Sequence, residues 1–174
     1  MGWKEMCKMV IRYFCLLSVC LVFSGCKPLT TGVSVTGYSH MEGVPIYSFS
    51  VNGGAGGGNL EGGAAGAESC CILIPNQWRP GLKAKIAWEY DTYQDDPAPP
   101  LPSQSVEVDV PEYTKPGTFQ VHFYPGHKVK LVVSSCRPGH SFYPMSKEDL
   151  LPWAPRETQE ETKAAAKGGW KNEC

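Results

Sequence analysis

Alternation of apolar and polar residues is the main structural signal in this chain. Its clearest example is the segment 82–90, where every second residue is apolar and Lys83, Lys85 and Glu89 lie between. A period of two residues is typical of a strand with one buried face. Strand-like patterns of this kind occur in seven segments, residues 33–38, 46–51, 71–74, 82–90, 106–110, 119–123 and 129–133.

Short turns separate most of these segments. Pro-Gly pairs stand at 80–81, 116–117, 125–126 and 138–139, where proline presets one turn angle and glycine adopts the positive one. Seven strands without crossover helices favour an all-β fold. We therefore predict an antiparallel β-sandwich or barrel of about seven strands, formed by residues 33–153.

The N-terminus has the pattern of a lipoprotein signal peptide. Basic residues precede an apolar run over 13–23, and Ser24-Gly25-Cys26 follows it. The run is too short for a spanning helix, and its small-residue end is typical of a cleavage site. A lipobox with phenylalanine at position 23, where leucine is usual, predicts removal of residues 1–25 and lipidation of Cys26. The alternatives are cleavage by the ordinary signal peptidase and an uncleaved anchor.

Lipidation would hold the mature protein to a membrane through a tether of residues 26–32. Several acyl chains together anchor stably, since each buried methylene contributes about 0.8 kcal/mol. Lys27 is not the aspartate that retains lipoproteins in the inner membrane in enteric-type sorting. We therefore expect the protein at the outer membrane, facing the periplasm.

Charge and size limit the function classes. The full chain carries a net charge of −1, and the signal peptide removes more basic than acidic residues. The mature chain is therefore slightly acidic, which argues against nucleic-acid binding and against electrostatic attraction to anionic lipid. About 150 mature residues suffice for one ordinary domain.

Cysteine usage fits an oxidising compartment. The cysteines that remain after cleavage and lipidation are Cys70, Cys71, Cys136 and Cys174. A bond between neighbours would need a strained eight-membered ring, so we expect Cys70 or Cys71 to pair with Cys136. Cys174 would then pair with the other cysteine or remain free. Metal binding is disfavoured, because no histidine or second cysteine pair stands at zinc spacing.

Two irregular segments and a charged tail interrupt the strand pattern. Residues 52–66 are glycine-rich but lack the lysine and the helix of a phosphate-binding loop, so we expect a connection between strands that could face a partner. Residues 91–104 are rich in proline and aspartate and predict an exposed acidic loop. The tail, residues 154–174, could form a short helix over its charged part or be disordered.

No catalytic motif is evident. The chain has no Gly-x-Ser-x-Gly elbow, and Ser39-His40 stands in a turn-like stretch. Cys136 with His140 could form a thiol site, although a structural disulfide is favoured in the periplasm. The four histidines are widely spaced. We therefore expect a protein without enzymatic activity, metal, cofactor or small-molecule substrate.

An ordered series of motifs spans residues 33–145. It includes Gly37-Tyr38-Ser39-His40, Cys70-Cys71 followed by Trp78-Arg79-Pro80-Gly81, and Pro138-Gly139-His140. The series resembles a family of bacterial lipoproteins catalogued as domain of unknown function 3304. Its members are similar in setting to immunity lipoproteins found beside type VI secretion lipase effectors. The resemblance implies a non-catalytic protein that neutralises a secreted (phospho)lipase; the alternative is an envelope structural or assembly lipoprotein without a toxin partner.

Partner-binding residues can be proposed only by residue type. Exposed aromatic side chains and acidic loops are usual anchors of protein interfaces. The candidates in the glycine-rich and acidic segments are Asn59, Leu60, Glu61, Tyr90, Asp91, Tyr93, Asp95 and Asp96. Trp78 and Trp88 are expected in the core instead.

Overall fold

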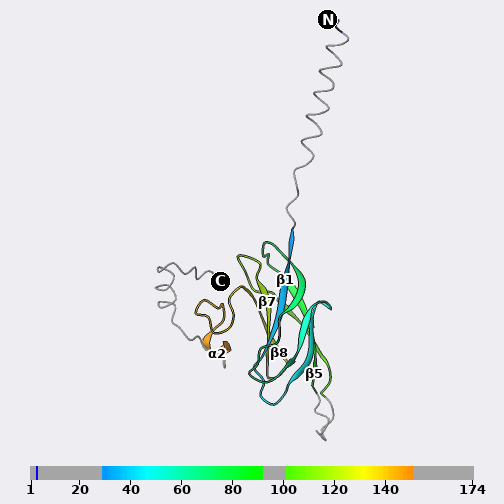
Figure 1. The fold of residues 1–174 in the computed structure, drawn as a ribbon, viewed down its shortest axis with the longest axis vertical. Coiled ribbons are helices and arrows are strands. Elements are labelled where there is room, and N and C mark those ends of the chain that lie inside the picture. Colours follow the sequence, from blue (N-terminus) through cyan, green and yellow to red (C-terminus); the bar gives the residue numbers. More distant parts are fainter. Residues whose placement is uncertain (1–2, 4–28, 92–100, 151–174) are drawn as a thin grey trace.

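A computed structural model describes residue 3 and residues 29–91 and 101–150, and its described part is an all-β domain (Figure 1). The strands are β1 (Thr30–Ser39), β2 (Ile46–Val51), β3 (Gly56–Leu60), β4 (Ser69–Pro75), β5 (Lys83–Tyr90), β6 (Gln104–Asp109), β7 (Thr118–Tyr124) and β8 (Lys128–Ser134), with one short helix, α2 (Lys147–Leu150). The predicted fold class is confirmed. The predicted signal peptide, most of the predicted acidic loop and the predicted tail lie outside the described residues. Within the described ranges, no helix has the length and apolarity needed to span a membrane.

Two four-stranded sheets form the sandwich. The strand order is β4-β1-β7-β8 in one, called here sheet A, and β3-β2-β5-β6 in the other, called sheet B. All pairs are antiparallel except β1 and β7, which run parallel. This parallel pair is an exception to the expected antiparallel pattern.

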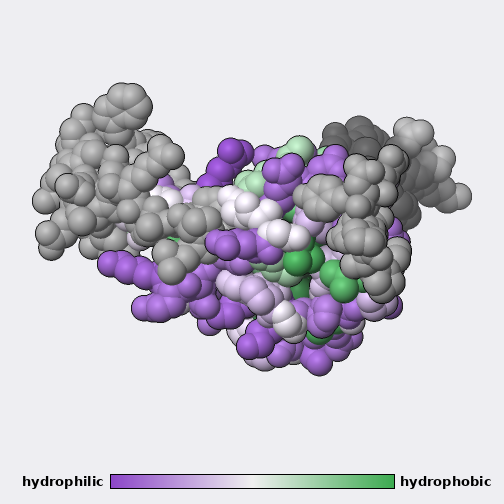
Figure 2. Space-filling model, turned by 90° about the horizontal axis from the view of Figure 1, so that it is seen from below, coloured by the Kyte–Doolittle hydropathy of each residue, from purple (hydrophilic) through white to green (hydrophobic). Residues whose placement is uncertain are grey.

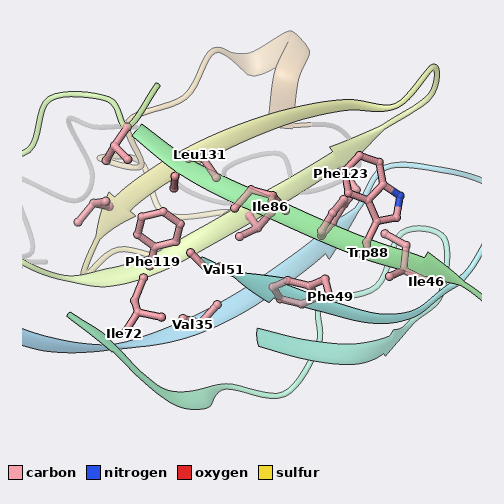
Figure 3. Close-up of a cluster of buried hydrophobic side chains, with 14 of the residues drawn as sticks. Val35, Ile46, Phe49, Val51, Ile72, Ile86, Trp88, Phe119, Phe123 and Leu131 are labelled. Carbon is pink, nitrogen blue, oxygen red and sulfur yellow. The ribbon is translucent and has the colours of Figure 1, made fainter. Parts of the chain in front are cut away.

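The core lies between the two sheets (Figure 3). Val35, Phe119 and Phe123 from sheet A meet Phe49 and Ile86 from sheet B, and each is at most 5% exposed. Strand β5 alternates buried and more exposed residues along its length, as the period of two predicts. Trp88 belongs to the core, and Trp78 packs against it.

Strand β3 corrects the sequence prediction, which treated residues 52–66 as a connection. Gly56 and Gly58 pair with β2 at Ser50 and Ser48. A Cβ atom at either glycine would collide with the backbone of β2. The glycines therefore allow a close strand pairing here, which an apolar-polar pattern cannot reveal.

The outer face of sheet A is also covered. A second apolar cluster consists of Val132, Cys136, Tyr143 and Leu150, with Met145 packed against it. Because of this cover, the five central residues of β7 are buried on both faces. The segment 135–150 is thus a third layer over sheet A.

Candidate functional site

Polar side chains of β1 and β7 are buried beneath this third layer. The parallel register places Tyr38 opposite His122, and their rings stack with centroids 4.8 Å apart. His40 follows the end of β1, and its ring stacks on Tyr124. Gln120 lies two residues before His122 and is 1% exposed. Residues far apart in the sequence therefore form one polar layer.

Hydrogen bonds connect this layer into a chain. His40 Nε2 lies 2.9 Å from His122 Nδ1, and His122 Nε2 lies 2.6 Å from the Tyr143 hydroxyl. That hydroxyl donates to Gln120 Oε1 at 3.0 Å. Since a tyrosine hydroxyl has one proton, His122 Nε2 must be the donor to Tyr143, and His122 Nδ1 accepts from His40. Each bond thus runs in the same direction.

The series of hydrogen bonds ends at backbone carbonyl groups at the end of β8 and in the covering segment. Gln120 Nε2 donates to the carbonyl of Ser134 at 3.0 Å and to that of Cys136 at 2.7 Å. Tyr124 donates to the carbonyl of Asp149 at 2.6 Å. These bonds satisfy buried polar groups and fix the segment 135–150 on sheet A.

Burial keeps the hydrogen-bonded side chains of His122 and Tyr143 uncharged. Burial, and then the neighbouring His40, lower the pKa of His122 to about 3, since a low-dielectric surrounding disfavours the charged imidazole. Burial also raises the pKa of Tyr143 well above its ordinary value. At neutral pH, His122 and Tyr143 are therefore uncharged hydrogen-bonding groups.

A polar pocket of about 240 Å³ lies beside the buried layer. The Glu68 carboxylate accepts hydrogen bonds from Ser34 and Thr118 and pairs with Arg137 at 3.3 Å. The hydrogen bond from Ser34 is the main cause that lowers the pKa of Glu68. Gln120 and Tyr38 also line this pocket. Its hydroxyl, amide and charged groups suit a small polar molecule, but they are largely bonded to one another.

The structure places Ser39 and two of the histidines differently from what the sequence suggested. Ser39 is the last residue of β1 rather than part of a turn, and its Oγ accepts from the Met41 amide at 3.3 Å. The fold brings His40 and His122 together, although they are distant in sequence. In the part of the chain that the structure describes, no group of three potential ligands could hold a metal. The alternation on β7 predicted that His122 and Gln120 lie on one face. Only the fold shows that Tyr143, Glu68 and Arg137 lie beside them.

The cysteine pairing also differs from the expectation. Cys70 is bonded to Cys71 on the exposed part of β4, so the expected bond from this pair to Cys136 is wrong. Cys136 is disulfide-bonded as well. Its Sγ lies 3.4 Å from His140 Nδ1, but the bonded sulfur is not a thiol nucleophile.

Peptide mapping of the mature, non-reduced protein tests this pairing. We predict one tryptic peptide that contains Cys70 and Cys71 and is two hydrogens lighter than its dithiol form. If residues 1–25 are removed and Cys26 is lipidated, as the sequence predicts, Cys136 should be linked to Cys174, the cysteine that then remains. Detection of Cys70 or Cys71 linked to Cys136 would contradict the pairing. Reduction before digestion is the control.

The partner-binding candidates separate into three groups. Leu60 is fully buried, and Tyr90 is 8% exposed with its hydroxyl bonded to His127, so both predictions of surface contacts are wrong. Both side chains fill the sandwich core because of their inward strand positions. Asn59, Glu61 and Asp91 are exposed. The last group, Tyr93, Asp95 and Asp96, lies outside the described residues.

The exposed candidates lie at one end of the sandwich. Ile46 pairs with Leu60 on one side and with Tyr90 on the other. Asn59 and Glu61 are the residues on either side of Leu60, and Asp91 follows Tyr90. All three therefore lie near Ile46. We call this end, defined by Ile46, Asn59, Glu61 and Asp91, the distal end.

Comparison with family models identifies the family of this chain. No curated protein matches the chain, and no solved structure matches it. A family model described as "Protein of unknown function (DUF3304)" matches residues 38–131, from the end of β1 into β8. Because this match covers more than half of the 174 residues, the chain belongs to the DUF3304 family.

Proposed function

We propose that this protein is an outer-membrane lipoprotein that faces the periplasm, binds a lipase effector delivered by type VI secretion and neutralises it. The lipobox supports the location, since the residues before Cys26 have the pattern of a lipoprotein signal. The motif series over residues 33–145 resembles the DUF3304 lipoproteins, whose members are similar in setting to immunity lipoproteins beside lipase effectors. This resemblance supports a secreted lipase as the partner.

We propose binding rather than catalysis because the reactive side chains are already bonded within the fold. Cys70, Cys71 and Cys136 are disulfide-bonded. His122 is buried, and both its ring nitrogens are within hydrogen-bond distance of His40 and Tyr143. These groups stabilise the fold. The exposed surface is therefore what this domain offers to a partner.

The distal end is the surface that we assign to the lipase. Figure 2 views the molecule from this side and shows a few apolar residues near the middle with hydrophilic residues beside them. Apolar surface next to polar surface is common in protein interfaces. Glu61 and Asp91 add exposed negative charge at its edge. Such charges would attract a basic rim around the entrance of a lipase active site.

A toxicity assay tests the proposed function. The proposal expects a lipase gene beside the gene of this protein. That lipase is directed to the periplasm with and without the protein, and cell survival is counted. We expect survival to rise when the protein is present. Unchanged killing with the protein at normal abundance would contradict the immunity role and favour the structural alternative.

Charge reversal at the distal end tests the assigned surface. We expect Glu61→Lys with Asp91→Lys to weaken lipase binding by about tenfold to a hundredfold, because like charges would then face each other. Calorimetric titration of the purified pair measures this change. Glu112→Lys with Asp109→Lys is the matched control, since both residues are also exposed but lie at the other end, Asp109 at the end of β6 and Glu112 in the β6–β7 connection. An equal loss of lipase affinity in both variants would show that the distal end is not the contact surface.

A further inference from the structure

Two leucines are unusually exposed in the described domain. Leu29 is 86% exposed and Leu73 is 73% exposed, more than any other large apolar side chain described from residue 29 onward. Tyr47, Leu101 and Phe142 follow with 57%, 49% and 36%. Exposed large apolar side chains that gather at one place mark a contact with a partner or a membrane.

Both leucines belong to one corner of the sandwich. Leu29 immediately precedes β1, and its carbonyl accepts from the Asn76 amide at the end of β4. Leu73 lies on β4, the edge strand of sheet A, opposite Gly32. Because glycine has no side chain, nothing at position 32 covers Leu73. We call Leu29, Gly32, Leu73 and Asn76 the tether corner.

The neighbouring connections are fixed at the same end of the domain. Tyr113 donates to the carbonyl of Pro75 at 2.7 Å, and Trp78 donates to that of Val110 at 2.8 Å. These bonds join the end of β4, the β4–β5 turn and the β6–β7 connection. The tether corner is thus part of a rigid end of the sandwich.

The length of chain before this corner limits its distance from a lipid anchor. Cys26 precedes Leu29 by three residues. Three residues span at most about 11 Å when fully extended. Leu73 is paired with Gly32, three residues further along β1, which adds roughly 10 Å. Both leucines can therefore reach the interfacial region of the bilayer that holds the Cys26 lipid.

We propose that the tether corner lies on the membrane surface, with Leu29 and Leu73 inserted among the lipid headgroups and upper acyl chains. This inference rests on the anchoring at Cys26 that forms part of the proposed function. The contact is apolar, since the mature chain has no excess of basic charge to attract anionic lipid. It orients the distal end away from the membrane. The separation is less than the length of β1, about 33 Å, because β1 must tilt for both leucines to reach the lipid.

Hydroxyl-radical footprinting of the lipidated protein in vesicles tests this orientation. The vesicles contain phosphatidylethanolamine and phosphatidylglycerol only, and flotation first shows that the protein is anchored. Leu101 is an internal standard, because it has the same side chain and is less exposed in the domain. In contact with lipid, Leu29 and Leu73 should be oxidised at least about fivefold more slowly than Leu101, and added salt should not change this ratio.

Each outcome separates the orientation from the anchoring. Faster oxidation of both leucines than of Leu101 on floating vesicles would overturn the membrane contact and leave the proposed function intact. Failure to float would instead remove the anchoring on which both depend. Protection that disappears when the protein is diluted in lipid would assign the corner to a second copy and overturn the proposal.

Substitutions at the corner give a second measurement. Leu29→Glu with Leu73→Glu should keep the anchor but make the Leu73 peptide accessible to radicals and protease on vesicles. Tyr47→Glu is the matched control, because Tyr47 is exposed on β2 of sheet B, and it should leave the corner protected. Equal accessibility in the double variant and in the wild-type protein would contradict the lipid contact.

Discussion

Replacement of Phe123 by alanine should lower the free energy of unfolding by about 3–5 kcal/mol, the usual effect of removing a large buried aromatic side chain. Phe123 is 1% exposed. It contacts Phe49 and Trp88 of sheet B edge to face, with ring centroids 5.3 and 5.5 Å away. Removal would leave a cavity between the sheets. Urea denaturation followed by tryptophan fluorescence measures the change.

Phe142→Ala is the matched control for this prediction. Phe142 is 36% exposed, so its removal should cost less than about 1 kcal/mol. An equally small effect of both substitutions would mean that Phe123 does not fill the centre of the core. An unfolded Phe123→Ala variant would agree with the prediction, and Phe123→Leu, which leaves a smaller cavity, then allows a measured value.

Acid should destabilise the protein through His122 well before carboxyl groups are protonated. Its pKa is lowered to about 3 in the folded state, against about 6.5 in an unfolded chain. Between these values the unfolded chain binds a proton that folded His122 does not. The free energy of unfolding therefore falls as the pH falls, by about 1.4 kcal/mol per pH unit. Between pH 6.5 and pH 5, the loss should be about 1–2 kcal/mol, since the unfolded histidine is only half protonated at pH 6.5.

The variant His122→Gln isolates this effect. Glutamine does not titrate, and its amide can still donate and accept hydrogen bonds. Urea denaturation at several pH values should show a smaller slope between pH 5 and pH 6.5 than in the wild-type protein. The carboxyl groups with lowered pKa, Glu68 and Asp149, act in the same direction but at lower pH. An unchanged slope in the variant would show that His122 is not the group responsible.

The strands could be predicted where one face is buried and the other is exposed to solvent. Strands β5 and β6 show this alternation directly, because one side of each packs on the core. Strand β3 could not be found in this way, since three of its five residues are glycine. Its formation depends on the close approach to β2, which is a property of two strands together.

The candidate site depended even more on long-range contacts. Alternation identified Gln120 and His122 as the polar face of β7. A polar face normally points to water, and nothing local indicates that residues 135–150 will cover it. Tyr143 and the carbonyl of Cys136 are bonded to Gln120 across 23 and 16 residues. Leu60 and Tyr90 were misassigned for the related reason that exposure is decided by packing.

The sequence by itself determined the all-β class and the approximate positions of most strands, because these depend on residue type and on short-range order. It also predicts a lipobox at Cys26. The tertiary structure decided which cysteines pair, which side chains are buried and which ends of the strands lie together. It joined His40, His122, Gln120 and Tyr143 into one hydrogen-bonded chain and left Leu29 and Leu73 exposed at one corner. Such features arise from distances between segments that only packing brings together.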